Sequence, residues 1–266
     1  MHKANKINAL VQLVAFLLML AINAAANILP LNGLNTGEIS AMYPNFFVPA
    51  GYTFSIWILL YSLQAWWILF CLRIAFQKKD DLPSAGMITL LMPYFSLACM
   101  LNAFWIMAWH FLQISLSLIV MVLLLLVLIT IYIQLRALTV PPEGWISWFI
   151  PVVFVAYLAW ICVATIANAA ALLIKIKADH LFSNEPLWSV LMMGVALILS
   201  GWIGGSRREP VFAFVLCWAF LGIYHGQHDK SPLVAYFAMG ASVLSGVIGV
   251  YSGVNKMKDS AINGVL

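Results

Sequence analysis

Apolar segments as long as a bilayer is thick recur along the whole chain, and they constrain its fold more than any other feature. A bilayer core of about 30 Å needs roughly 20 apolar residues per helix. Eight segments meet this requirement, at about residues 8–29, 50–72, 86–109, 112–135, 146–174, 188–205, 210–226 and 232–254. The sequence therefore predicts an all-α polytopic membrane protein with about eight transmembrane helices.

The composition agrees with a chain that lies mostly in lipid. Hydrophobic residues make up 64% of the sequence and charged residues 8%, with a mean hydropathy of +1.01, whereas soluble domains carry about 25% charged residues. Basic residues never cluster beyond pairs such as Lys78-Lys79 and Arg207-Arg208. We therefore expect the lipid bilayer as the main partner and no nucleic acid.

The basic residues lie unevenly around the eight segments. With the N-terminus inside, the outer side receives only Lys175, Lys177 and Lys230. The inner side receives Lys3, Lys6, Arg73, Lys78, Lys79, Arg136, Arg207, Arg208, Lys256 and Lys258. Inner loops carry the excess of Lys and Arg in membrane proteins. The sequence predicts a multi-pass protein of the cell (inner) membrane with both termini in the cytoplasm.

No acidic or basic residue lies deep in a predicted span, which argues against an ion-coupled transporter or a pump. The polar groups at depth are uncharged: Asn23, Asn27, Gln64, Asn102, Thr165 and Asn168. An amide in lipid needs partners, so each is expected to face the helix bundle. There it would either bond to another helix or contact a ligand.

A proline-braced segment leads into the second span. Pro44 and Pro49 keep the chain extended until about Gly51, where a helix can begin. Trp57 and Tyr61 are four residues apart on that helix and share one face. This aromatic face is either a wall for a flat apolar ligand or a surface that packs helices and marks the membrane interface.

Cysteine and histidine give no metal motif. The four cysteines lie inside apolar segments without metal-like spacing, and we interpret them as packing residues. The histidines His110, His180, His225 and His228 fall on the predicted outer side, where we expect solvated loop residues and no metal ligand. No nucleophile–base pair, paired carboxylates or phosphate-binding glycine loop is readable, so no catalytic residue is predicted.

Three segments, in order on consecutive predicted spans, resemble the TspO/translocator-protein family of tryptophan-rich sensory proteins. The matching residues are Pro44, Pro49, Trp57 and Tyr61 in the first segment, Asn102 and Trp105 in the second, and Tyr157, Trp160, Ala164 and Asn168 in the third. The chain departs from the family pattern at Phe46, Gly51, Ser55, Ile106 and Ala156, and it has Met121 where the family has Asp. The resemblance covers roughly residues 8–174.

The resemblance implies a five-helix bundle over residues 1–174, followed by an additional three-helix membrane region at 175–266. It also implies an apolar pocket for a planar ligand such as a porphyrin or haem, with no cofactor required. The ligand-binding residues that it implies are Trp57, Tyr61, Asn102, Trp105, Trp160, Ala164, Ala167 and Asn168. Family members often dimerise, so a homodimer is an expected assembly.

Binding of such a ligand is compatible with three roles: sensor, scavenger or facilitator of transport. A porphyrin-modifying membrane enzyme that uses the aromatic pocket itself is an alternative. A structural or regulatory membrane subunit, whose last three spans dock a partner, is another.

Overall fold

The computed structural model describes residues 2–29, 31–76, 85–137, 146–178 and 185–262, and these ranges contain helices and no strands. Eight of the described helices are long and apolar enough to cross a membrane. They are Asn5–Ile28, Gly51–Phe76, Ile88–His110, Ile114–Arg136, Trp148–Lys175, Pro186–Ser206, Pro210–Gln227 and Pro232–Asp259. The predicted all-α polytopic fold and its eight spans are confirmed.

Two of the spans begin or end in a non-α turn. The second starts as the 3₁₀ helix η2 (Gly51–Ser55) and continues as α3 (Ile56–Phe76), which confirms that helix begins at Gly51. The sixth starts as α7 (Glu185–Leu199) and ends as the π-helix η4 (Ser200–Ser206). Pro93 and Pro151 lie inside continuous helices, α4 (Ala85–His110) and α6 (Ile146–Lys175).

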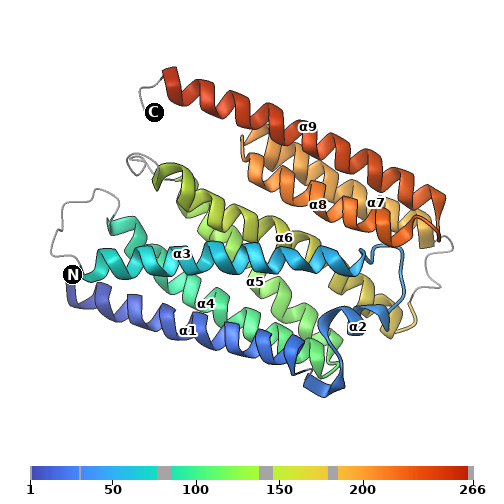
Figure 1. The fold of residues 1–266 in the computed structure, drawn as a ribbon, viewed down its shortest axis with the longest axis horizontal. Helices are drawn as coiled ribbons and strands as arrows, with labels where there is room; N and C mark the ends of the chain where they lie inside the picture. The colour runs from blue at the N-terminus through green and yellow to red at the C-terminus, as the bar shows by residue number, and fades with distance from the viewer. Residues whose placement is uncertain (1, 30, 77–84, 138–145, 179–184, 263–266) are drawn as a thin grey trace. The chain divides into compact units, whose positions relative to one another are not determined.

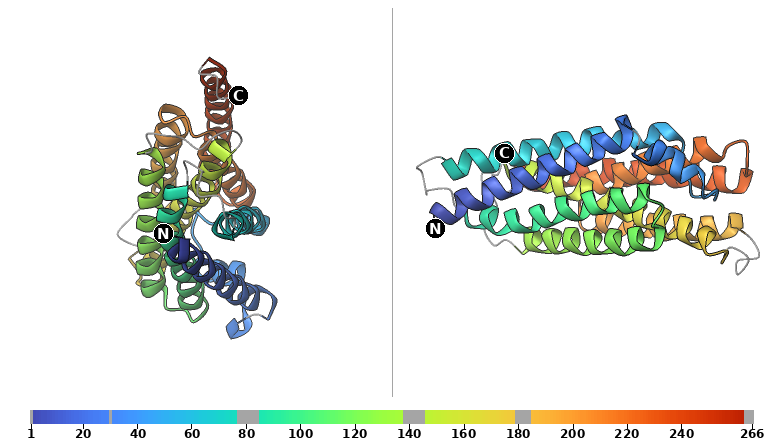
Figure 2. Two further views of the ribbon diagram at one scale, coloured as in Figure 1. Left: turned by 90° about the vertical axis from the view of Figure 1, so that its left-hand side faces the viewer. Right: turned by 90° about the horizontal axis from the view of Figure 1, so that it is seen from below.

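The described helices group into two compact units, each treated separately below. The first unit comprises Met1–Thr36 and Trp57–Phe154. Within it, α1 (His2–Ile28) packs on α4, and α4 packs on α5 (Ile114–Arg136), as Figures 1 and 2 show. Its core is aromatic, since the Trp67 ring lies 6.4 Å from Phe95 and 5.0 Å from Phe154, both edge to face.

The second unit comprises Gly37–Ile56 and Val155–Leu266. In it, α8 (Pro210–Gln227) packs along α9 (Pro232–Ile262), and both contact η4 (Figure 1). The short helix α2 (Thr36–Ala41) and the 3₁₀ turn η2 also fall here, and η2 packs on α8.

The two units do not follow the order of the chain, because residues 37–56 group with the C-terminal helices. The continuous helix α6 contributes its first residues to one unit and the remainder to the other. The predicted division into a family-like bundle at 1–174 and an added region at 175–266 concerns a different boundary, and it stays a prediction.

Candidate ligand site

Four aromatic rings in the first unit form a continuous stack that we name the indole ladder: Trp57, Tyr61, Trp105 and Trp109. Trp57 stacks on Tyr61 with ring centroids 5.4 Å apart and on Trp105 at 6.1 Å. Trp105 stacks on Trp109 at 6.4 Å. The i, i+4 spacing on α3 and again on α4 places each pair on one helix face, as the sequence predicts for Trp57 and Tyr61.

The centre of the ladder carries a polar atom without a partner. Trp105 is 6% exposed, and its indole Nε1–H has no hydrogen-bond acceptor among the described residues. A buried donor without an acceptor costs free energy, so such groups are rare in stable folds. This donor is not used by any described residue.

A second unsatisfied group lies on the same helix face as Trp57 and Tyr61. Gln64 follows Trp57 by seven residues, which is close to two helical turns, or about 10 Å along the axis. It is 1% exposed, and neither its amide nitrogen nor its amide oxygen has a partner within the described ranges. The first unit therefore contains both an aromatic surface and buried polar groups with free bonding capacity.

Asn102, one turn before Trp105 on α4, already has a protein partner. It is fully buried, and its side-chain oxygen accepts a hydrogen bond from Asn23 Nδ2 at 2.9 Å. Asn23 Nδ2 also donates to the Met19 carbonyl at 2.9 Å. The expectation that these amides join helices is confirmed for this pair, which holds α1 against α4 and fixes the face on which Trp105 lies.

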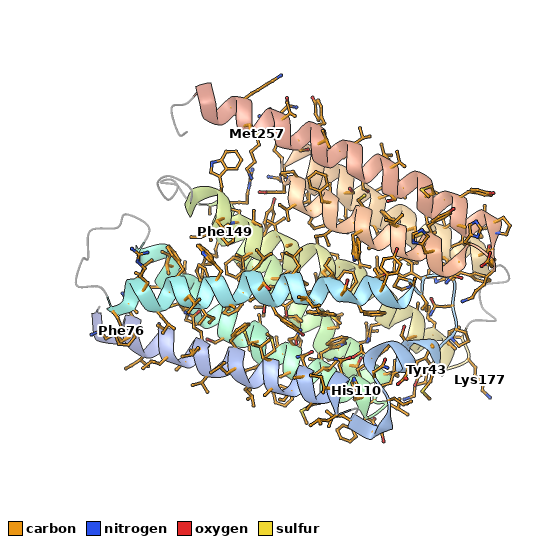
Figure 3. The ribbon with its side chains drawn as sticks, in the orientation of Figure 1. Tyr43, Phe76, His110, Phe149, Lys177 and Met257 are labelled. Atoms are coloured by element: carbon orange, nitrogen blue, oxygen red, sulfur yellow. The ribbon has the colours of Figure 1, made fainter. Side chains whose placement is uncertain are left out.

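The ladder ends beside a buried histidine. His110 closes α4 and is fully buried, with Nδ1 3.2 Å from the Leu31 carbonyl and Nε2 3.1 Å from the Thr36 hydroxyl (Figure 3). A carbonyl oxygen only accepts, so Nδ1 is the donor to Leu31. Trp109 Nε1 donates to the Thr36 carbonyl at 3.4 Å.

The prediction that His110 is solvated is therefore wrong. The segment after α1 folds over the end of α4 and supplies the partners that water would otherwise give. His225 and His228 are exposed, and His180 lies outside the described residues. No group of three or more His, Cys, Asp or Glu side chains that could hold a metal occurs in the described part of the chain.

The predicted ligand residues divide between the units. Trp57, Tyr61, Asn102 and Trp105 lie in the first unit, and Trp160, Ala164, Ala167 and Asn168 lie on the part of α6 in the second. Trp160 is buried and meets the edge of Phe54 at 6.4 Å. The sequence analysis did not select Trp109, although its position four residues after Trp105 is the signal that places it in the stack.

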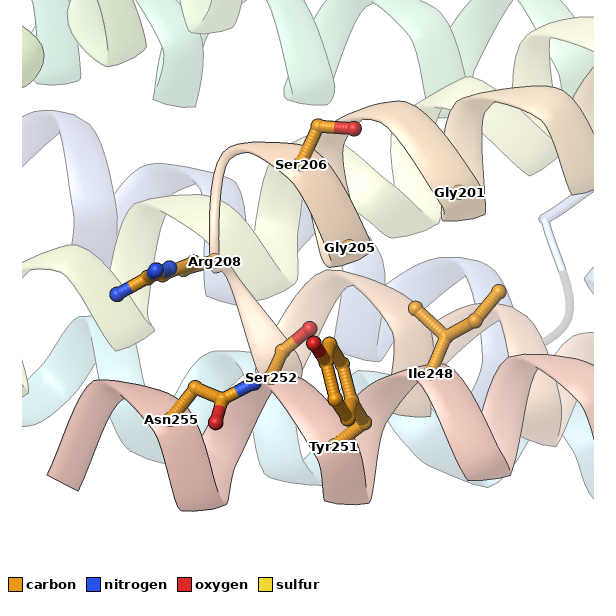
Figure 4. A pocket seen from close by; sticks show the side chains of 8 residues that line it. All are labelled: Gly201, Gly205, Ser206, Arg208, Ile248, Tyr251, Ser252 and Asn255. Atoms are coloured by element: carbon orange, nitrogen blue, oxygen red, sulfur yellow. The ribbon is translucent and has the colours of Figure 1, made fainter. Parts of the chain in front are cut away.

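The second unit contains a groove between η4 and α9, of about 470 Å³ (Figure 4). It is lined by Gly201, Gly205, Ser206, Arg208, Ile248, Tyr251, Ser252 and Asn255. The charged groups here are paired with each other: Arg208 bonds to Asp259, and Lys256 Nζ lies 3.1 Å from Glu209 Oε2. These pairs tie the end of η4 and the start of α8 to α9, so we interpret the groove as part of a structural joint.

The eight apolar helices define a multi-pass α-helical membrane protein, and the indole ladder gives it a candidate surface for an aromatic ligand. The sequence matches the model of the family described as TSPO-like protein over residues 9–251, and the chain belongs to that family. The match extends the resemblance seen at 8–174 into α9. Neither the comparison with curated proteins nor the comparison with solved structures found a match.

Proposed function

We propose that this TSPO-like protein binds a planar hydrophobic ligand, such as a porphyrin or haem, on the indole ladder. In this proposal it acts as a sensor, scavenger or facilitator in the cell (inner) membrane, with both termini in the cytoplasm. The observation that carries the proposal is the buried Trp105, whose indole N–H has no acceptor among the described residues and whose ring stacks with Trp57 and Trp109.

Ring geometry supports a flat ligand. Stacked aromatic pairs contribute about 0.5–1.5 kcal/mol beyond the burial of their area. The ladder rings Trp57, Tyr61, Trp105 and Trp109 are nearly parallel, with 25–27° between neighbouring planes. Their shared orientation suits an extended π-system better than a globular hydrocarbon.

The unpaired polar groups near the ladder limit the chemical class of ligand that would fit. The free groups near the ladder are uncharged: the indole N–H of Trp105 and the amide of Gln64. They suit a ligand that carries a hydrogen-bond acceptor for the indole N–H and a further polar group for the amide. A large heteroaromatic ring with polar substituents has both features, whereas a simple hydrocarbon has neither.

The α6 residues Trp160, Ala164, Ala167 and Asn168 remain proposed ligand residues on the family resemblance alone. The same resemblance supports a homodimer as the proposed assembly. Single substitutions on α6 test these residues independently of the ladder.

The test is a titration of the purified protein in detergent with haem or protoporphyrin, followed by quenching of tryptophan fluorescence. We expect saturable quenching, and a Kd raised about tenfold or more by Trp105→Ala, since each factor of ten is about 1.4 kcal/mol. Trp202→Phe is the matched control, because Trp202 lies on η4 and is half exposed beside Arg207. An unchanged Kd in Trp105→Ala would show that the ladder is not the site.

A further inference from the structure

The segment Tyr43–Ser55, which we name the strap, is hydrogen-bonded along its main chain to α8. An irregular segment has no ladder of its own, so its buried N–H and C=O groups need partners elsewhere. Three bonds from α8 supply them: Ala50 N–H to Gly222 O at 2.9 Å, Trp218 Nε1–H to Thr53 O at 3.0 Å, and Gln227 Nε2–H to Val48 O at 2.8 Å.

Two glycines on α8 permit this close approach. A Cβ atom at Gly222 would lie 2.1 Å from Thr53 Oγ1, and one at Gly226 would lie 2.8 Å from Ala50 N and 2.9 Å from Val48 O. The two positions are four residues apart and share one helix face. This face of α8 is therefore shaped to receive the strap backbone.

Side chains of the strap extend the same contact. The Tyr52 ring meets the edge of Trp218 at 5.4 Å, and its hydroxyl lies 2.7 Å from His225 Nδ1. Inside the strap, Asn45 Oδ1 accepts from Phe47 N–H at 2.9 Å and forms a tight turn. The strap therefore has an internal turn at Asn45–Phe47 and is bound to α8 over residues 48–53.

The strap is continuous with the first ring of the indole ladder. It ends at Ser55, and Trp57 follows after a single residue. Phe54 also contacts Trp160 on α6, another proposed ligand residue. Within the second unit, the strap therefore connects α8 to Trp160.

From this contact we propose that α8 is a clasp: its hold on the strap sets how fast the ligand reaches and leaves the proposed ligand residues of α6. The inference rests on the proposed function for the identity of the ligand. It gives a role to helices beyond residue 174, where the resemblance alone supplies none. Trp218 and Gln227 are positioning residues, since they act on the ligand only through the strap.

The test compares Trp218→Phe combined with Gln227→Leu against the wild type. These changes remove two donors to the strap and keep side chains of similar size. We expect the Ala50 amide to exchange its hydrogen about tenfold faster, because local opening requires fewer bonds to break. We also expect the haem on-rate and off-rate, from stopped-flow quenching, to rise together about threefold or more, with Kd changed less than about twofold.

Ser242→Ala is the matched control. Ser242 Oγ donates to the Cys217 carbonyl at 2.9 Å, so the variant breaks a bond between α9 and α8 instead of one between α8 and the strap. It should leave Ala50 exchange and the ligand rates unchanged.

Unchanged Ala50 exchange in the double variant would overturn the clasp. Faster exchange with unchanged ligand rates would overturn its control of the ligand. A wild type that binds no haem or protoporphyrin would overturn the proposed function instead, and the exchange result would then decide by itself whether α8 holds the strap.

Discussion

Two tryptophans, one in each unit, differ in the hydrogen bonding of their indole N–H. Trp218 of the second unit is partly buried and donates its indole N–H to the Thr53 carbonyl at 3.0 Å. Trp105 of the first unit is 6% exposed and has no acceptor in the described part of the chain. The first arrangement stabilises a joint between segments, whereas the second leaves bonding capacity unused where it is costly. In the second unit α8 holds the strap, and in the first unit the ladder is the proposed binding surface.

The largest effect is expected from a substitution that adds atoms to the contact between α8 and the strap. Gly222→Ala places a methyl group against the Thr53 side chain, and overpacking of this kind costs about 1–3 kcal/mol. Gly240→Ala on α9 is the control, because its new Cβ meets no described atom within 4 Å and alanine favours a helix by up to about 1 kcal/mol. Thermal unfolding in detergent measures both. Equal melting temperatures would show that the strap does not lie against Gly222.

The next effect distinguishes a satisfied amide from an unsatisfied one. Gln12 accepts a hydrogen bond from Trp67 Nε1 at 3.2 Å, so Gln12→Leu leaves a buried donor unpaired and costs about 1–3 kcal/mol. Gln64→Leu removes an amide without a described partner, and we expect unchanged or increased stability but weaker haem binding. Unfolding and quenching titrations measure the two properties. A destabilised Gln64→Leu would place Gln64 in an internal bond instead of at the ligand.

A pair of Trp→Phe substitutions, which keep an aromatic ring and remove the indole N–H, tests the comparison of the two tryptophans. Trp105→Phe removes an unpaired donor, so we expect a Kd raised about threefold to tenfold and a loss of stability only from the smaller ring, less than in Trp218→Phe. Trp218→Phe removes a donor in use, so we expect a loss of about 1 kcal/mol of unfolding free energy and a Kd within about twofold of wild type. Both variants are measured by unfolding and by quenching. If both variants changed the unfolding free energy and the Kd by the same amounts, the distinction between Trp105 and Trp218 would be lost.

The smallest effect is expected at the exposed edge of the strap. Tyr52→Phe removes only the hydroxyl that bonds to His225 Nδ1 and keeps the ring against Trp218. Since water replaces a bond at an exposed site, we expect a loss of about 0.5 kcal/mol or less. Chemical unfolding monitored by circular dichroism measures the loss of unfolding free energy. A larger loss than expected would show that the Tyr52 hydroxyl, and not the main-chain bonds, holds the strap.

Much of the fold was predictable because it depends on local patterns. Segment length and apolar content give all eight spans, and the i, i+4 spacing gives the stacking of Trp57 on Tyr61. That Asn23 and Asn102 each need a partner followed from their place in lipid, whereas their pairing with each other was not predicted. These features follow from residues close in sequence or from the solvent alone.

The strap and the buried histidine were not predictable in the same way. The bond from Trp218 to Thr53 joins residues 165 positions apart, and its acceptor is a main-chain carbonyl with no side-chain signature. The burial of His110 depends on where the segment after α1 folds, which helical periodicity does not specify. The unpaired N–H of Trp105 is visible only once every neighbouring acceptor has been placed.

The grouping of residues 37–56 with the last helices has a practical consequence for anyone who wishes to trim the protein. A fragment cut after Lys175 would keep every motif by which the chain resembles its family. It would also leave the Val48 and Thr53 carbonyls and the Ala50 amide without the groups that now bind them. A shorter version of the protein would need a redesigned strap, because the fragment would lack α8, the helix that binds the strap.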